Sequence, residues 1–105
     1  MIEKNYKYSV AETKTIEKVV GAKNVHINHM ILPKGDCLPL HYANSNVYMT
    51  VMRGTISLIL DEQEQHDYGV GNILNIPNNT KMNVCNNDDP VAEILVVKAP
   101  APGSK

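Results

Sequence analysis

The sequence predicts an all-β fold, and the number of its strands favours a closed barrel or jelly roll over a small open sheet. Short runs rich in β-branched and aliphatic residues recur along the chain, and turn residues separate these runs at close intervals. No segment of the sequence is typical of a long helix. About eight short strands fit into the chain, and closure into a barrel removes the unpaired edges that an open sheet would expose.

The expected strands follow from this alternation of apolar runs and turns. Gly54 separates two of the runs, and the acidic stretch "DEQE" (61–64) is expected to form a solvated hairpin loop. Extended segments are expected at residues 13–20, 25–32, 41–43, 47–53, 55–60, 65–68, 80–86 and 91–99, with a further short strand inside 69–77.

Length and composition indicate one domain with an aliphatic core. Natural domains usually contain about 50–250 residues, so a chain of 105 residues forms one. The chain has no Phe or Trp and five Tyr, so Val, Ile, Leu and Met must fill the core. We assign residues 1–23 to an N-terminal strand region that two subunits could exchange in a dimer. Residues 24–98 form the barrel, and residues 99–105 form a mobile tail, because its Pro and Gly cannot extend a sheet.

Charge and cysteine usage exclude several classes of function. A formal net charge of −1 gives no electrostatic reason to expect nucleic acid or an anionic membrane as a partner. No apolar run approaches the roughly 20 residues of a membrane-spanning helix, and "MIEKNYKYSV" lacks the apolar centre of a secretory signal. A cytoplasmic location is therefore expected, in which Cys37 and Cys85 stay reduced as small buried hydrophobes. Their spacing excludes a zinc-finger motif.

Two glycines and a histidine in the middle of the chain form the first of two motifs. Gly35, His41 and Gly54 occupy three places of a pattern that runs Gly, five residues, His-x-His, three or four residues, Glu, six residues, Gly. The second His place holds Ala43, and the Glu place holds Val47. This pattern resembles the first motif of the cupin family, which are small jelly-roll barrels with a metal site.

A second pattern follows the first. It runs Gly, five residues, Pro-x-Gly, two residues, His, three residues, Asn, and Gly71, Pro77 and Asn86 fit it. Asn79 stands in the second Gly place, and Met82 stands in the His place. Asn tolerates a positive φ better than most residues, so the resemblance implies that the positions that shape a cupin backbone are kept.

The resemblance implies a single-domain cupin-type double-stranded β-helix with a degenerate metal site. Of the four metal-ligand places, only His41 holds a ligand. Iron, manganese or zinc ions need about three or four N, O or S ligands, and neither Ala43 nor Val47 offers one. We therefore assign no metal, no cofactor and no catalytic residue.

Strand alternation places a pocket around His41. Side chains two positions apart share a face, and the family register would turn His41, Met49 and Met82 into the barrel. The expected interior is one imidazole in an apolar cavity lined by methionine. The residues expected to contact a ligand there are His41, Met82, Asn28, Asn46 and Tyr48.

The two asparagines each have a second interpretation. Asn28 shares a strand face with His26 and Met30, which the family register turns inward, whereas the more apolar opposite face of that strand favours the reverse. Asn46 belongs to "ANSN" (43–46), which either forms a polar rim at the barrel mouth or serves as a turn.

We favour a homodimeric, cytoplasmic cupin that binds an unidentified small molecule, and leave open whether it is an enzyme. One alternative is a metal-dependent oxygenase or isomerase with unusual ligands, since His26, His41 and Met82 would form a soft set suited to Cu(I). Another is a metal-free acid–base isomerase with His41 as the base, although Tyr48 has the opposite parity to Val47 and an orienting carboxylate is not evident. A filled barrel with a structural role is the third.

Overall fold

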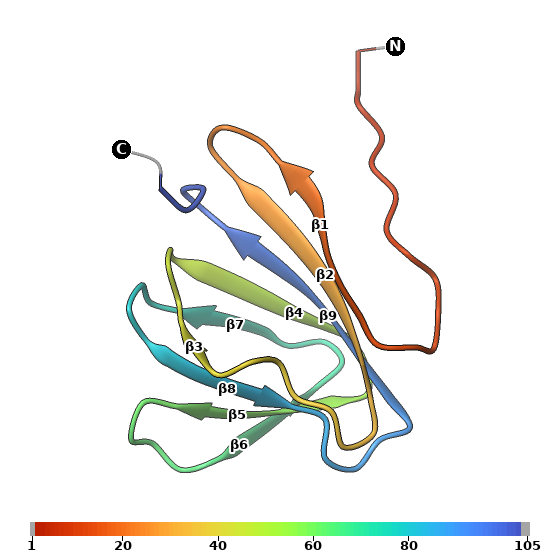
Figure 1. The fold of residues 1–105 in the computed structure, drawn as a ribbon, viewed down its shortest axis with the longest axis vertical. Helices are drawn as coiled ribbons and strands as arrows, with labels where there is room; N and C mark the ends of the chain where they lie inside the picture. The colour runs from red at the N-terminus through yellow and green to blue at the C-terminus, as the bar shows by residue number, and fades with distance from the viewer. Residues whose placement is uncertain (1, 104–105) are drawn as a thin grey trace.

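The computed structural model describes residues 2–103, and every regular element in this range is a β-strand. This confirms the predicted all-β class (Figure 1). No helix long and apolar enough to cross a membrane occurs within these residues. The strands are β1 (Thr15–Gly21), β2 (His26–Pro33), β3 (His41–Tyr42), β4 (Val47–Arg53), β5 (Thr55–Leu60), β6 (His66–Gly69), β7 (Ile73–Ile76), β8 (Lys81–Cys85) and β9 (Val91–Lys98).

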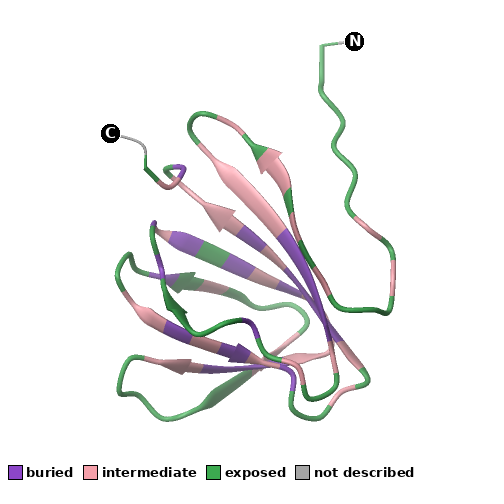
Figure 2. Cartoon of the chain, viewed as in Figure 1, coloured by how far each residue is buried: buried purple, intermediate pink, exposed green. Residues whose placement is uncertain are grey.

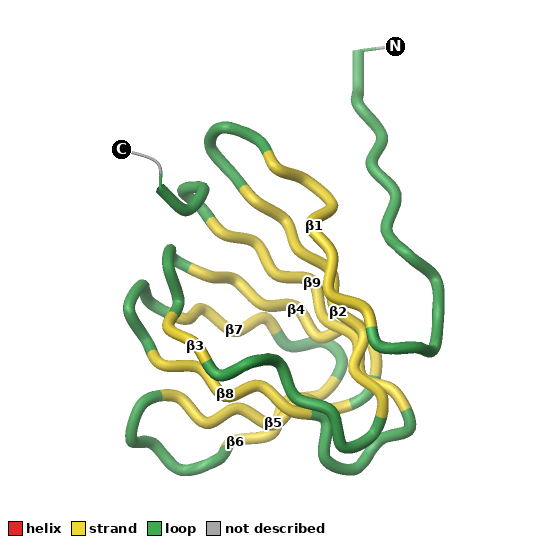
Figure 3. Tube along the Cα trace, in the orientation of Figure 1, coloured by secondary structure: helices red, strands yellow, loops and turns green. Residues whose placement is uncertain are grey.

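The strands form two facing sheets, as Figures 1 and 3 show. One sheet has the order β1-β2-β9-β4-β7, and the other has the order β3-β8-β5-β6. All the named pairings are antiparallel. Because β9 lies between β2 and β4, the last strand of the chain pairs with an early strand and with a middle one. This strand order arises only when the chain folds into the barrel.

The core lies between the two sheets and follows the predicted alternation. In β4, Val47, Met49 and Val51 are buried and Tyr48 is exposed, so the bands of colour alternate along this strand in Figure 2. Met82 and Val84 of β8 come from the facing sheet, and both are buried in the same core cluster. Aliphatic and methionine side chains thus fill the core, as the composition requires.

Two backbone positions show why the motif residues are kept. Gly54, between β4 and β5, has φ +67°, and a Cβ there would lie 2.4 Å from the carbonyl oxygen of Val91. Only glycine fits such a close approach. Asn79 has φ 69° in the place where the cupin pattern has glycine, which confirms the interpretation of that replacement.

The outer face of the five-stranded sheet carries a buried charged network that sequence interpretation missed. His29 of β2 is 0% exposed; its Nδ1 lies 2.7 Å from an oxygen of Glu17, and its Nε2 lies 2.5 Å from an oxygen of Glu93. Each ring nitrogen of His29 therefore has a carboxylate partner on the outer face. Arg53 Nε donates to the other oxygen of Glu93 at 2.7 Å.

The segment that precedes β1 closes over this network. The backbone N–H and the hydroxyl of Ser9 donate to the carboxylate of Glu17 at 2.8 and 2.9 Å. Arg53 Nη1 donates to Glu12, and the ring of Tyr8 lies 4.6 Å from that of His29. Both faces of β2 are therefore buried, one in the barrel and the other beneath the chain's own N-terminal segment.

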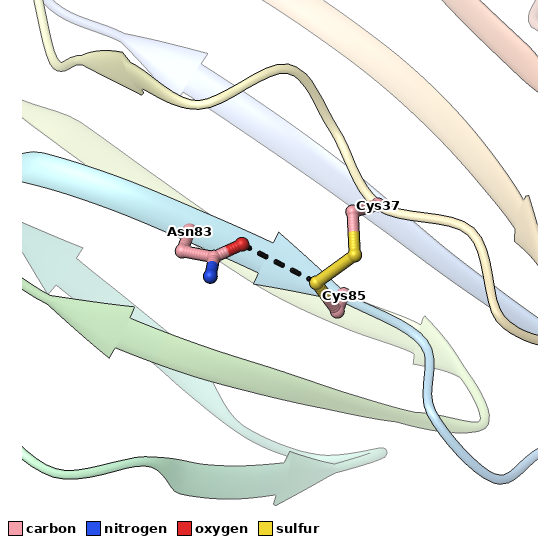
Figure 4. Close-up of a disulfide and its surroundings, with 3 residues drawn as sticks. All are labelled: Cys37, Asn83 and Cys85. Carbon is pink, nitrogen blue, oxygen red and sulfur yellow. Dashed lines mark hydrogen bonds between the residues drawn. A yellow bond between two sulfur atoms is a disulfide. The ribbon is translucent and has the colours of Figure 1, made fainter.

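The two cysteines require a correction, because they were expected to stay reduced. Cys37 and Cys85 form a disulfide across 48 positions of sequence, at an isolated antiparallel bridge between the two residues (Figure 4). Oδ1 of Asn83 lies 3.3 Å from Sγ of Cys85. A disulfide sulfur has no hydrogen to donate, so we interpret this approach as a contact. Strand pairing brings the two Cα atoms to 4.1 Å, which no spacing rule could indicate.

Both ends of the described chain lie outside the strands. The first strand begins at Thr15, so residues 2–14 form an extended segment without a strand. In the expected tail, Ala101 is buried and the hydroxyl of Ser45 donates to the carbonyl of Pro100, so this part packs on the barrel. Residues 104 and 105 of that prediction lie outside the described residues.

Candidate functional site

A hollow lies between the two sheets, at the end of the barrel where β3 begins. It contains about 310 Å³ of space not filled by atoms, which includes the solvent at its open mouth. The enclosed cavity itself measures about 30 Å³, well below the range of about 300–1,000 Å³ that is usual for small-molecule sites. The residues that line it are Met30, Leu38, His41, Ala43, Val47, Met49, Met82, Val96 and Lys98.

Strand register brings these side chains together. His41 of β3 pairs with Met82 of β8, so the two side chains share one face of the four-stranded sheet. On the facing sheet, Met49 of β4 pairs with Val96 of β9, and Met30 lies one strand further along. Three of the chain's five methionines therefore meet in one hollow. His41 and these three methionines thus line the same hollow.

His41 occupies the mouth of the hollow, which corrects the expectation that its imidazole lies in the barrel interior. The residue is exposed, and its Nδ1 lies 2.7 Å from the carbonyl oxygen of Pro39. Because that carbonyl only accepts, Nδ1 carries a hydrogen and donates it, which leaves Nε2 free of that contact. The main chain of Pro39 thus orients the ring, and among residues 2–103 no carboxylate does so.

Lys98 is a lining residue that the sequence interpretation missed. Its Nζ donates to Oδ1 of Asn44 at 3.2 Å, in the loop between β3 and β4. Burial lowers the pKa of Lys98, and the nearby charge of Lys18 lowers it further. Burial likewise lowers the pKa of His26, with smaller effects from Lys18 and Lys98. Parity along β9 could have indicated this residue, since Val96 and Lys98 are two positions apart.

The family register of β2 holds, because Met30 lines the hollow and His26 pairs with Lys98. Asn28 has the same parity, and its Oδ1 is buried without a hydrogen-bond partner. Asn28 lies beside the hollow, since it pairs with the lining residue Val96, but it is not itself part of the lining.

Two other predicted pocket residues lie away from the hollow. Asn46 accepts a hydrogen bond from Nδ2 of Asn75 at 2.9 Å, and its carbonyl accepts one from the N–H of Ala99. This is the turn role of the "ANSN" segment. Tyr48 requires a correction: it is 44% exposed and has the opposite parity to Val47 and Met49, so its side chain leaves the barrel on the outer face.

The residues of the hollow do not fit the metal centre that the motifs of the fold suggest. Ala43, Val47 and Met82 stand where a cupin of the metal-binding kind has His, Glu and His, and the first two are apolar lining residues. In the part of the chain that the structure describes, no three His, Cys, Asp or Glu side chains gather closely enough to hold an ion. His26 is absent from the lining, so the soft set with His41 and Met82 is not assembled there.

Comparison with known proteins places this geometry in a family. No protein-family model matches the chain. An uncharacterized protein of Methanocaldococcus jannaschii is 45% identical over 103 residues, which are 97% of this chain and 89% of that protein. Its crystal structure, described as an RmlC-like cupin family protein with a double-stranded β-helix fold, matches with a TM-score of 0.94 over 97% of this chain and 94% of that one. The chain belongs to the RmlC-like cupin family.

More distant solved structures show that the fold is shared without close similarity of sequence. A cupin superfamily protein of Desulfitobacterium hafniense is 11% identical, with a TM-score of 0.75 over 90% of this cupin and 84% of that chain. A DMSP lyase of Ruegeria pomeroyi is also 11% identical, with a TM-score of 0.76 over 96% of this cupin and 58% of that chain. At such identities the likeness concerns the fold alone.

Proposed function

We propose that this cupin binds a small, partly apolar molecule in the hollow between its sheets and that it has lost the usual metal site. The observation that carries the proposal is the lining itself, in which Met30, Met49 and Met82 surround an opening marked by His41. Small-molecule sites are concave and mostly apolar, with a few polar groups that fix orientation. Methionine is flexible and polarizable, so its side chains adapt to irregular apolar ligands.

The loss of the metal site is supported by the same lining. Lys98 adds a positive charge beside the hollow, which opposes the binding of a cation. The acid–base alternative has less support, because Tyr48 leaves the barrel and the partner of His41 is the carbonyl of Pro39. A base in an isomerase needs an orienting group and an acid within reach.

The methionine methyl groups offer a direct test of binding. The protein is labelled with ¹³C at its methionine methyls and titrated with 1-pentanol, a neutral probe with a short apolar body. The methyl signals of Met30, Met49 and Met82 should shift together, whereas Met52, which does not line the hollow, serves as the internal control. Absence of any shift, or an equal shift of Met52, would overturn the proposal.

A metal measurement tests the second half of the proposal. Untagged protein is purified without chelator, and its metal content is compared with that of His41→Ala. We expect less than stoichiometric metal in both proteins. Stoichiometric metal that disappears in His41→Ala would show that His41 belongs to a working centre and would restore the metalloenzyme alternative.

We further propose that the protein is a cytoplasmic homodimer whose residues 1–23 contact the partner subunit. Large apolar side chains of this segment are exposed, among them Ile2, Tyr6 and Val10. Sedimentation equilibrium of wild type and Val10→Ser tests the dimer, and a monomeric wild type would refute it.

The disulfide bears on location, since reducing compartments disfavour such bonds. Alkylation of free thiols in intact cells therefore tests the compartment, and fully oxidised Cys37 and Cys85 in the cell would count against a reducing cytoplasm.

A further inference from the structure

Two lysines and a histidine gather at the mouth of the hollow. His26 of β2 pairs directly with Lys98 of β9, and Lys98 lines the hollow. Lys18 of β1 pairs with Asn28, two positions along β2 from His26. Side chains two apart on a strand share a face, so Lys18, His26 and Lys98 lie on the face of the sheet that forms the hollow.

The side chain of Lys18 leans towards this group. A Cβ added to Gly21 would lie 3.1 Å from Cδ of Lys18, and Gly21 is the strand partner of His26. Gly21 therefore leaves room for the lysine stem to cross beside the imidazole. The mutual effects of charge agree with this placement, since the charge of Lys18 lowers the pKa of both His26 and Lys98.

No acidic side chain balances these groups. Among residues 2–103 neither Lys18 nor Lys98 forms an ion pair, and the polar partner of Lys98 is the neutral amide of Asn44. The carboxylates of Glu17 and Glu93 have the opposite parity and serve the network on the outer face of the sheet. A partly buried ammonium without a counterion is unfavourable, so an anion that reaches this mouth relieves an existing electrostatic cost.

The interior imposes a second requirement on any ligand. Met30, Met49 and Met82 present thioethers and methyl groups, and Val47 and Val96 add hydrocarbon. A strongly hydrated inorganic anion has no body to place there. A ligand that meets both requirements has a charged head at Lys98 and an apolar body among the methionines.

We propose that the hollow selects a small organic anion, a monocarboxylate with a short apolar chain, whose head binds Lys98 beside His26 and Lys18. This inference rests on the proposed function and adds the chemical class of the ligand. A carboxylate accepts hydrogen bonds from an ammonium in its preferred geometry.

Three probes of equal chain length separate charge from apolar character. Pentanoate, 1-pentanol and pentylammonium are titrated into the ¹³C-methionine-labelled protein at low ionic strength. Pentanoate should bind about tenfold or more tightly than 1-pentanol, because a hydrogen bond to a charged group is stronger than a neutral one. Pentylammonium should bind more weakly than either.

Substitution of the lysine gives the matched control. Lys98→Met keeps an unbranched stem and removes the charge, so pentanoate should lose about tenfold in affinity while 1-pentanol is little affected. Lys34→Met removes a lysine from the exposed turn after β2, and its affinities should equal those of wild type. Thermal unfolding of each variant confirms that it is folded before its titration is compared.

The outcomes distinguish this inference from the function on which it rests. Equal binding of pentanoate and 1-pentanol, or equal loss of both in Lys98→Met, would overturn the preference for anions and leave the binding function standing. Tighter binding of pentylammonium, or of Ag(I) as a probe for a soft cation, would overturn it in favour of a cation site. If none of the probes moves the three methionine signals, both proposals fail together.

Discussion

The buried network on the outer face of the sheet gives the sharpest prediction about stability. Glu93 is 7% exposed and accepts hydrogen bonds from two groups, the His29 ring at 2.5 Å and Arg53 Nε at 2.7 Å. Glu93→Gln preserves the shape of the side chain and removes its charge. One oxygen and one NH₂ group then face two donors, so one of the two donors must lose its acceptor.

The expected cost follows from the exposure of each partner. A net hydrogen bond to a charged group contributes about 1.5–3 kcal/mol when it is buried. His29 is fully buried, whereas the side chain of Arg53 is 37% exposed, so solvent screens the contribution of Arg53. We expect Glu93→Gln to lower the free energy of unfolding by about 2–3 kcal/mol. In a domain of this size, that lowers the Tm by roughly 10–20 °C.

Urea unfolding at pH 7 measures the effect, with Glu12→Gln as the matched control. Glu12 also accepts from Arg53, at 3.1 and 3.2 Å, but its side chain is 74% exposed. Its substitution should therefore change stability by less than about 0.5 kcal/mol. Equal effects of the two substitutions, or an effect of Glu93→Gln below that value, would refute the reasoning from burial.

Three further predictions concern pH, the disulfide and the turn glycine. Burial raises the pKa of Glu93, but hydrogen bonds from His29 and Arg53 outweigh it and hold the pKa below the usual 4.5. This stabilisation is therefore present above pH 4.5 and is lost as the pH falls through the folded-state pKa, so urea unfolding between pH 6 and pH 3 should show a shallower loss in Glu93→Gln than in wild type. Reduction of Cys37–Cys85, which closes a loop of 48 positions, should destabilise the fold by up to about 4 kcal/mol, and an unchanged Tm with reductant would contradict this. Gly54→Ala should cost more stability than Gly35→Ala, because both have a positive φ but only Gly54 has a carbonyl 2.4 Å from the new Cβ; equal costs in thermal unfolding would count against the close approach.

Strand alternation and the preferences of turn residues were enough to predict inward-facing side chains and one positive φ. The alternation in residues 47–51 predicted which side chains enter the barrel, and Val47, Met49 and Val51 are all buried. Asn79 in a glycine place predicted a positive φ, which is observed. The same alternation predicted that the side chain of Tyr48 points away from the barrel interior. Its inclusion among the pocket residues was wrong, because the alternation holds at this position of β4 without a bulge.

The features that sequence interpretation missed all join residues from distant strands. His29 meets Glu93 at a separation of 64 positions, and Cys37 meets Cys85 at 48. Lys98 could have been placed on the inner face by parity, but its role depends on β1 and β2 lying beside β9. The closure of the barrel decides which strands are neighbours, and the local sequence pattern does not predict these neighbours.

For this cupin, the sequence by itself determined the strands, the turns and the faces that turn inward, because a period of two and the steric demands of a positive φ act within a few residues. Only the tertiary structure decided what those faces meet. The crossover that places β9 between β2 and β4 creates the methionine-lined hollow, sets His26 and Lys98 side by side at its mouth, and buries His29 between two carboxylates. Interactions across strands depend on the distance between residues in space, which cannot be read from their separation in sequence.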